Sequence, residues 1–271
     1  MSPWIVSGIV VLAAAWLALA WQHRRRNRQR LLAASLTPGQ RAIVERLVPL
    51  VKRLPPPLRA ALEGKMNLFL DQVTFRGYNG ISVTEEMRLS IAAQACLLVM
   101  NSPLWYDSLR NVLIYPAAFF TDRERHDGGL VHGGRQGLLG ESWTRGPVVL
   151  SWDDALRGGL NPADGHNVVI HEFAHQLDAL SGHVDGIPIL RKGQRYAGWE
   201  RAMLEAYEGH VRRLERGEYT LIDPYGATNH QEFFAEAIVT FFEKPQALRS
   251  EEPALYDQLG QLLGIDPAQW V

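Results

Sequence analysis

Residues 171–175 of this chain read His-Glu-Phe-Ala-His, and this short pattern constrains the local structure more than any other part of the sequence. Two histidines four positions apart lie on nearly the same face of an α-helix, where both imidazoles point at one metal ion. Apolar residues at 168–170 precede the pattern, so we expect a helix from about His166 to Leu180. Glu172 then lies beside the metal, placed to take a proton from the water that the metal activates. The alternative is a buried helix whose histidines bond only to backbone groups.

A catalytic zinc site needs a third protein ligand and one open position. The metzincin pattern requires Gly at 178 and His at 181, but this chain has Asp178 and Ser181, which excludes that class. Farther along, the apolar helical pattern at 229–243 carries Glu232 and Glu236 on one face. A carboxylate is costly to bury unless it is paired or binds a metal, so we expect one of them to ligate the metal and the other to hold a ligating imidazole. The residues alone do not order the two, and a surface position for both is the alternative.

The first thirty residues differ from the rest of the chain. Every residue from Trp4 to Trp21 is apolar or small, and a basic run follows from His23 to Arg30. A helix of that apolar length reaches ~27 Å, close to the thickness of a bilayer core. We therefore predict a transmembrane helix at 1–22, a basic juxtamembrane linker at 23–36 and a metallopeptidase domain at 37–271. The alternative is an apolar helix docked on a soluble domain.

The arginines after the apolar segment also predict its orientation. By the positive-inside rule they stay in the cytoplasm, which places the protein in the inner (cytoplasmic) membrane as a single-pass protein with its catalytic domain facing the cytoplasm. A formal net charge of -1 gives no reason to expect a nucleic-acid partner. The single cysteine, Cys96, lies in an apolar run and is expected to be a buried thiol.

The remaining pattern predicts an α+β domain that is mostly helical. Thr37 and Thr84 are placed to cap helices, and 112–115 and 146–152 read as short strands. The polar, glycine-rich stretch at 121–146 is expected to be a loop in which His126 and His132 are solvated. Further helices are expected at these residues: 41–54, 58–69, 85–100, 198–216 and 229–243.

Two known families share motifs with the second half of the chain. Residues 225–236, Tyr-Gly-Ala-Thr-Asn-His-Gln-Glu-Phe-Phe-Ala-Glu, look like the corresponding segment of the anthrax lethal factor protease domain. Residues 145–154 and 165–178, which include the His-Glu-Phe-Ala-His pattern, more closely resemble the Mlc titration factor family of bacterial peptidases. Both resemblances imply a zincin-like fold and a gluzincin, a zinc peptidase whose third ligand is a downstream glutamate.

The resemblance also implies roles for individual residues. It makes Glu232 the third ligand of one Zn²⁺ per chain, beside His171 and His175, and it makes Glu236 the partner of a ligating imidazole. Tyr225 becomes the donor to the developing oxyanion. The strand residues Val148, Val149, Leu150 and Ser151 are expected to offer their edge to an extended peptide. For Asp178 two expectations stay open: support of a ligand, or a capping or surface role.

The expected function is hydrolysis of peptide bonds in a peptide or protein substrate through a metal-activated water. The sequence leaves open whether the enzyme is an aminopeptidase or an endopeptidase. The family's role implies a further partner, a transcriptional repressor of the Mlc type. The alternative function is therefore a membrane-tethered binding protein that sequesters such a repressor, with zinc mainly structural. A structural zinc usually has four protein ligands, and no cysteine lies near the histidines to supply the fourth.

Overall fold

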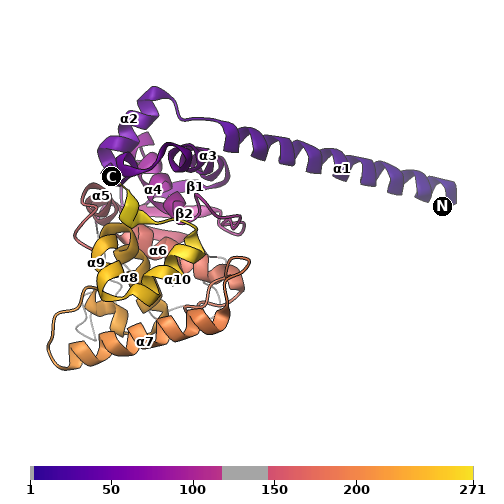
Figure 1. The fold of residues 1–271 in the computed structure, drawn as a ribbon. Coiled ribbons are helices and arrows are strands. Elements are labelled where there is room, and N and C mark those ends of the chain that lie inside the picture. The colour runs from indigo at the N-terminus through magenta and orange to yellow at the C-terminus, as the bar shows by residue number, and fades with distance from the viewer. Residues whose placement is uncertain (1–2, 118–145, 271) are drawn as a thin grey trace.

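The computed structural model describes residues 3–117 and 146–270 (Figure 1). His126 and His132 fall between these two ranges, so the expectation that both are solvated concerns residues outside the described part of the chain. The structure is mostly helical with one small sheet. In chain order its elements are α1 (Pro3–Ala33), α2 (Pro38–Leu47), η1 (Pro49–Arg53), α3 (Pro56–Gln72), β1 (Thr74–Gly77), α4 (Glu85–Leu97), β2 (Asn111–Tyr115), β3 (Val148–Ser151), α5 (Trp152–Leu160), α6 (Val168–Asp178), η4 (Ala179–Ser181), α7 (Tyr196–Glu215), η5 (Pro224–Ala227), α8 (His230–Glu243), α9 (Pro245–Glu251), α10 (Pro253–Leu263) and η6 (Pro267–Gln269).

The sheet has three parallel strands in the order β1-β2-β3. Both neighbours of β2 run parallel to it, with Val112 opposite Phe75 on one side and opposite Val148 on the other. Val112 and Ile114, on one face of β2, are fully buried, while Leu113 and Tyr115 on the other face are partly exposed. The sequence pattern predicts β2 and β3 but not β1, which has only four residues, most of them exposed.

Local capping signals start several helices where the sequence predicts them. Thr37 caps α2 with a capping box that includes Gln40, and the Thr84 hydroxyl accepts the backbone N–H of Met87 at the start of α4. Ser151 caps α5 in the same way by accepting the backbone N–H of Asp154, so Asp153 and Asp154 lie in the first turn of this helix.

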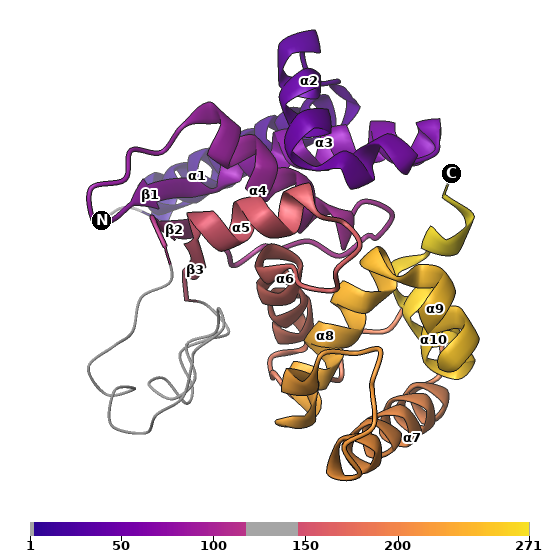
Figure 2. The same cartoon turned by 90° about the vertical axis from the view of Figure 1, so that its left-hand side faces the viewer.

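The core forms where α4 and α6 pack between the N-terminal helices and α8. Helix α4 contacts α2, α3 and α6, while α6 contacts α8 on its other side (Figure 2). Phe173 of α6 packs edge-on against Phe69 of α3 and Tyr106, which fixes the apolar side of α6. Cys96 is buried in this core, as predicted.

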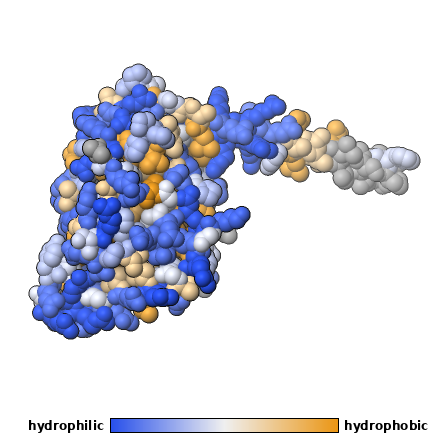
Figure 3. All heavy atoms as spheres, in the orientation of Figure 1, coloured by the Kyte–Doolittle hydropathy of each residue, from blue (hydrophilic) through white to orange (hydrophobic). Residues whose placement is uncertain are grey.

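Helix α1 extends away from the rest of the protein, with a hydrophilic section next to the body and a hydrophobic section farther out (Figures 1 and 3). The expectation that this segment crosses a membrane is wrong. Crossing a bilayer requires a helix that is both long enough and apolar enough. No helix among the described residues has both properties. Helix α1 is 31 residues long, but it continues without a break into the arginine-rich residues at 24–30. The predicted single-pass location in the inner membrane, with the domain facing the cytoplasm, is wrong for the same reason.

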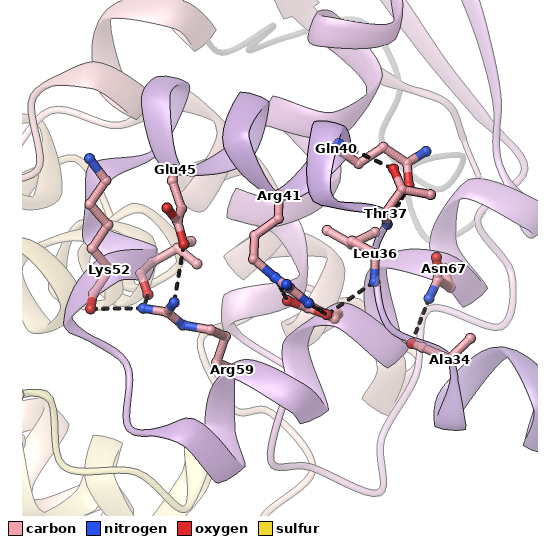
Figure 4. Close-up of polar contacts among 11 residues, drawn as sticks. Ala34, Leu36, Thr37, Gln40, Arg41, Glu45, Lys52, Arg59 and Asn67 are labelled. Atoms are coloured by element: carbon pink, nitrogen blue, oxygen red, sulfur yellow. Dashed lines mark hydrogen bonds and ion pairs between the residues drawn. The ribbon is translucent and has the colours of Figure 1, made fainter.

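The end of α1 and the residues that follow it are attached to α3 by a close approach of the two helices and by polar bonds, and Figure 4 shows the bond between Asn67 and Ala34. A Cβ at Gly64 would lie 2.1 Å from the carbonyl oxygen of Leu32, so only glycine allows the two helices to come this near. The side chain of Asn67 donates to the carbonyl of Ala34 at 2.8 Å. The carboxylate of the buried Glu63 accepts the backbone N–H of Leu36.

Candidate metal centre

The N-terminus of α6 is fixed by Asn167, whose side-chain oxygen accepts the backbone N–H of Ile170 at 3.0 Å. From this cap the helix rises through the two histidines while its apolar side chains enter the core. These buried apolar residues are Val169, Ile170, Phe173, Ala174 and Leu177. Because one side of α6 is held in the core, the opposite side must present His171 and His175 to α8.

Helix α8 begins at a similar cap, where the Asn229 side chain accepts the N–H of Glu232 at 3.0 Å. The helix is apolar almost throughout, and its five largest apolar side chains are buried: Phe233, Phe234, Ile238, Phe241 and Phe242. Glu232 and Glu236 are only 7% and 8% exposed. The alternative that both carboxylates lie on the surface is therefore wrong.

The side chains of His171, His175 and Glu232 converge on one point. The two histidine Nε2 atoms are 3.1 Å apart. Glu232 Oε2 lies 3.1 Å from Nε2 of His171 and 3.3 Å from Nε2 of His175. Among the residues that the structure describes, this is the one group of three such side chains close enough to share an ion.

This donor set fits a zinc ion. Two ligands that each lie ~2.0 Å from a tetrahedral zinc are about 3.3 Å from one another, close to the three measured separations. Two imidazoles and one carboxylate are also the ligands of several catalytic zinc sites, which leave a fourth position open. The outer nitrogen of His171 supports the same reading, because its Nδ1 lies 2.9 Å from Glu236 Oε1. A carboxylate in that position fixes the tautomer of the imidazole and directs Nε2 at the ion.

In the described part of the chain, His175 lacks the hydrogen bond at Nδ1 that His171 makes with Glu236. Its Nδ1 is buried and has no hydrogen-bond partner among the described residues, and the same holds for Oδ1 of Asp178, three residues later on α6. The other carboxylate oxygen, Oδ2, accepts the backbone N–H of Gly186 at 2.7 Å. Asp178 is fully buried, so a surface role does not describe it.

In this cluster the pKa of His171 is raised and that of Glu232 is lowered, and in each case burial acts against the effect of the neighbouring groups. For His171, burial lowers the pKa, but the hydrogen bonds to Glu232 and Glu236 outweigh burial and raise the pKa to about 10. For Glu232, burial raises the pKa, but the two imidazoles hold it well below its usual range. Protons therefore bind strongly between these groups, and a divalent cation has to compete with them.

Glu172 and Tyr225 lie next to this cluster. Glu172 is buried, and burial raises the pKa of its carboxyl against the opposing effect of both nearby histidines. Tyr225 lies on η5, with its ring centroid 6.0 Å from that of His171. Burial raises the pKa of the Tyr225 hydroxyl, and nearby glutamates raise it further, so this group stays protonated and can donate a hydrogen bond.

The expected peptide-binding strand is β3, at the end of the sheet. Its partner is β2, and among the described residues no strand pairs with its other edge. The side chains of Val148, Leu150 and Ser151 are buried, and that of Val149 is partly exposed. A bound peptide would therefore contact the backbone of this strand rather than the side chains.

Two polar groups near the site were not predicted from the sequence. Asp223 accepts the backbone N–H of Tyr225 at 2.8 Å, and its other oxygen lies 3.1 Å from Nδ1 of His166, just before α6. Glu243, at the last position of α8, contacts the residues that begin α6. Asp223 is followed by Pro224, a pair that is typical of a helix start, so the capping role of Asp223 could have been predicted from the sequence.

Comparison with known proteins gives consistent matches over most of the chain. A sequence model for the family described as glucose-regulated metallo-peptidase M90 matches residues 21–263. An uncharacterized protein of Synechocystis is 38% identical over 262 residues, which cover 95% of this chain and 94% of that protein. Mlc titration factor A of Klebsiella pneumoniae is 35% identical over 227 residues, 82% of this chain and 84% of that protein. The same-named protein of Salmonella arizonae is 34% identical, with 82% and 89% covered. The resemblance to the Mlc titration factor family is thereby confirmed.

Proposed function

The chain belongs to the glucose-regulated metallo-peptidase M90 family, and from this premise we propose that it is a zinc-dependent peptidase of the gluzincin type. In this proposal His171, His175 and Glu232 hold one zinc ion per chain. The observation that carries it is the convergence of three ligand atoms from α6 and α8, each within 3.3 Å of the other two. Two imidazoles and a carboxylate suit zinc better than the harder cations, which prefer oxygen ligands alone.

Zinc, when bound here, supplies a Lewis acid that polarises the scissile carbonyl and acidifies a water molecule. Glu172 is the proposed general base, which takes a proton from the attacking water and passes it to the leaving amine. Its carboxylate lies close enough to both histidines for their charges to affect its pKa. Removal of a general base typically costs ~10²–10⁴-fold in rate.

Tyr225 is the proposed donor to the oxyanion that forms at the attacked carbonyl. Its hydroxyl stays protonated over the whole physiological range, and its ring lies beside His171. The backbone N–H of Tyr225 donates to the Asp223 carboxylate, and this N-cap bond holds η5 in place. A positioned donor of this kind acts on the transition state more than on the bound substrate.

Two further roles are proposed around this centre. The free edge of β3 binds an extended peptide through its backbone groups. Specificity for the side chains of the substrate then comes from other parts of the site. Glu236 and Asp178 support the ligands: Glu236 through Nδ1 of His171, and Asp178 beside His175, where both groups have unused hydrogen-bonding capacity.

The test of the enzyme proposal is hydrolysis of a peptide library by the full chain and by its Glu172→Gln variant, with the zinc content of both. We expect equal zinc and a loss of at least ~100-fold in turnover for the variant. Glu208→Gln, an exposed change on α7, is the matched control and should behave as the parent. Full turnover by a zinc-loaded Glu172→Gln variant would refute the role of Glu172. The same library, with free and acetylated N-termini, separates an aminopeptidase from an endopeptidase.

The name of the Klebsiella and Salmonella relatives gives a second candidate function. We propose a transcriptional repressor of the Mlc type as the first partner to test, either as a substrate or as a protein that this chain sequesters. Incubation of the repressor with the parent and with Glu172→Gln distinguishes the two. Cleavage by the parent alone supports a substrate. Stable capture by both proteins, with no peptide cleaved by either, supports sequestration with a structural zinc.

A further inference from the structure

Helix α8 carries three buried acidic residues on one face, not two. Glu232, Glu236 and Glu243 are separated by four and seven residues, and 3.6 residues per turn brings all three to nearly the same side of the helix. Each of them contacts α6 or the residues just before it. Along α8 the acids come in the order 232, 236, 243, while their partners along α6 come in the reverse order 175, 171, 167. The two helices are therefore aligned by three polar contacts, and the metal centre accounts for two of them.

The third contact involves no histidine. Glu243 Oε2 accepts the backbone N–H of Gly165 at 2.8 Å, and Oε1 accepts the side-chain N–H of Asn167 at 3.2 Å. Both polar atoms of the Asn167 side chain therefore form hydrogen bonds: its oxygen caps α6, and its nitrogen donates to Glu243. Glu243 and Asn167 are both buried, so water does not replace these bonds easily.

The backbone at Gly165 is also confined. Its φ of +86° lies in the left-handed region that favours glycine, and a Cβ there would lie 2.6 Å from Nζ of Lys244. The carboxylate of Glu243 and the stem of Lys244 thus enclose the turn that leads into α6 from two sides. A shift of this turn along α8 would break the bond between the backbone N–H of Gly165 and Glu243.

We propose that Glu243 is a positioning residue for the metal centre, which fixes where α6 begins relative to α8 and so sets the distance between the two histidines and Glu232. This inference rests on the proposed function, since it assumes that the three ligands hold zinc. Metal ligands must be placed within about 0.2 Å of their ideal distances. His171 lies only four residues from the capped end of α6, so displacement of the cap moves this ligand.

Both carboxyl oxygens of Glu243 accept hydrogen bonds whether or not the group is protonated, whereas the amide nitrogen of glutamine accepts none. Glu243→Gln therefore keeps the shape of the side chain and removes one of the two bonds. Asn167→Ser provides an independent test from the other helix. Serine caps a helix about as well as asparagine but cannot donate to Glu243 across the same distance.

The experiment measures zinc affinity of the full chain by competition with a chelator, together with the visible spectrum of the cobalt-substituted protein. For Glu243→Gln and for Asn167→Ser we expect zinc binding about tenfold weaker and an altered cobalt spectrum, as for other outer partners of a metal site. The double variant should lose less than the sum of the two single losses, because both changes weaken the same contact between Glu243 and the residues that lead into α6.

The matched control is Glu63→Gln, which also removes a buried carboxylate that binds a backbone N–H, but on α3, which carries none of the proposed metal ligands. It should lower the unfolding temperature and leave zinc affinity and the cobalt spectrum unchanged. If Glu243→Gln behaves like this control, Glu243 is only structural and the inference is overturned. If the parent itself takes up no zinc, the proposed function fails first. The two failures are therefore distinguishable.

Discussion

In the described part of the chain, glutamates are buried at two contacts between helices, and the partners of those glutamates differ. Where α2 and α3 meet, Glu63 accepts two bonds from the guanidinium of Arg41, at 2.7 and 3.0 Å, and one from the backbone N–H of Leu36 (Figure 4). The bonds from Arg41 hold the pKa of Glu63 below its usual range. This interface is complete as it stands, because a permanent cation neutralises the buried acid.

Where α6 and α8 meet, the buried acids face imidazoles and amides instead. Glu232 and Glu236 contact His171, and Glu243 contacts Gly165 and Asn167. An imidazole carries a positive charge only when protonated, and an amide never does. The first interface therefore supplies its own cation, whereas we propose that the second binds one.

Of the changes at the two interfaces, Glu232→Gln is expected to have the largest effect on zinc affinity. The change removes the one anionic ligand from the cluster, so zinc affinity should fall by more than the ~10–100-fold expected for an outer partner. Without metal the variant should melt at a lower temperature than the metal-free parent, because the two imidazoles hold the pKa of Glu232 below its usual range and its charge therefore stabilises the fold at pH 7. Zinc titration and thermal melting of the variant measure both properties. Retention of the parent's zinc affinity would remove Glu232 from the ligand set.

A change beside the metal centre that replaces no ligand should slow the chemical step without lowering the zinc content. Tyr225→Phe removes a hydroxyl from η5, and we expect kcat to fall ~100-fold or more while zinc content stays the same. KM should change little, because the hydroxyl acts on the transition state. Steady-state kinetics on one good peptide substrate give both constants. A change in KM alone would indicate that Tyr225 binds substrate instead.

At the first interface, Glu63→Gln should reduce the free energy of unfolding by about 2 kcal/mol at pH 7 without affecting zinc. The pKa of Glu63 is lower in the folded state than in the unfolded chain, so its contribution is present above the unfolded value of 4.5 and is lost as pH falls through the folded value. The deficit of the variant should therefore shrink in acid. Urea unfolding at pH 7 and pH 4 tests this, and a deficit independent of pH would contradict it.

At the second interface, Glu243 should show the opposite pH dependence. Burial raises its pKa to about 8, with Asp164 raising it further and Lys244, Gly165 and Asn167 opposing. A raised carboxyl pKa stabilises the fold most below the unfolded value of 4.5, and this contribution is lost as pH rises toward 8. The metal-free parent should lose roughly 1–2 kcal/mol between pH 6 and pH 8 that Glu243→Gln does not lose. Equal losses in both proteins would show that Glu243 does not titrate in this range.

Much of the candidate site follows from local sequence signals. The spacing of His171 and His175 predicts the helix and its shared face, and the acids on the apolar α8 predict a buried partner for them. The caps at Thr37 and Thr84 are likewise local, since each involves residues within one turn. Such features depend on periodicity and chemistry within a few residues, which a sequence displays directly.

The parts that were missed depend on contacts between distant segments. β1 is too short to show a pattern, and it forms because β2, more than thirty residues later, offers a partner. The role of Glu243 arises from residues 76 to 78 positions earlier in the chain. Apolar composition also misled at the N-terminus, because eighteen apolar residues suggested a membrane span while the actual helix α1 runs on through the arginines.

The most direct test of the account is a zinc titration of the metal-free full chain, followed by thermal melting. We predict uptake of one zinc per chain and an unfolding temperature that rises with zinc, because at a concentration 1,000-fold above the Kd a bound ligand adds ~4 kcal/mol to stability. A chelator should reverse the rise, and Glu232→Gln should show none. A chain that takes up no zinc, or one whose Glu232→Gln variant is stabilised as strongly as the parent, would contradict the assignment of this centre.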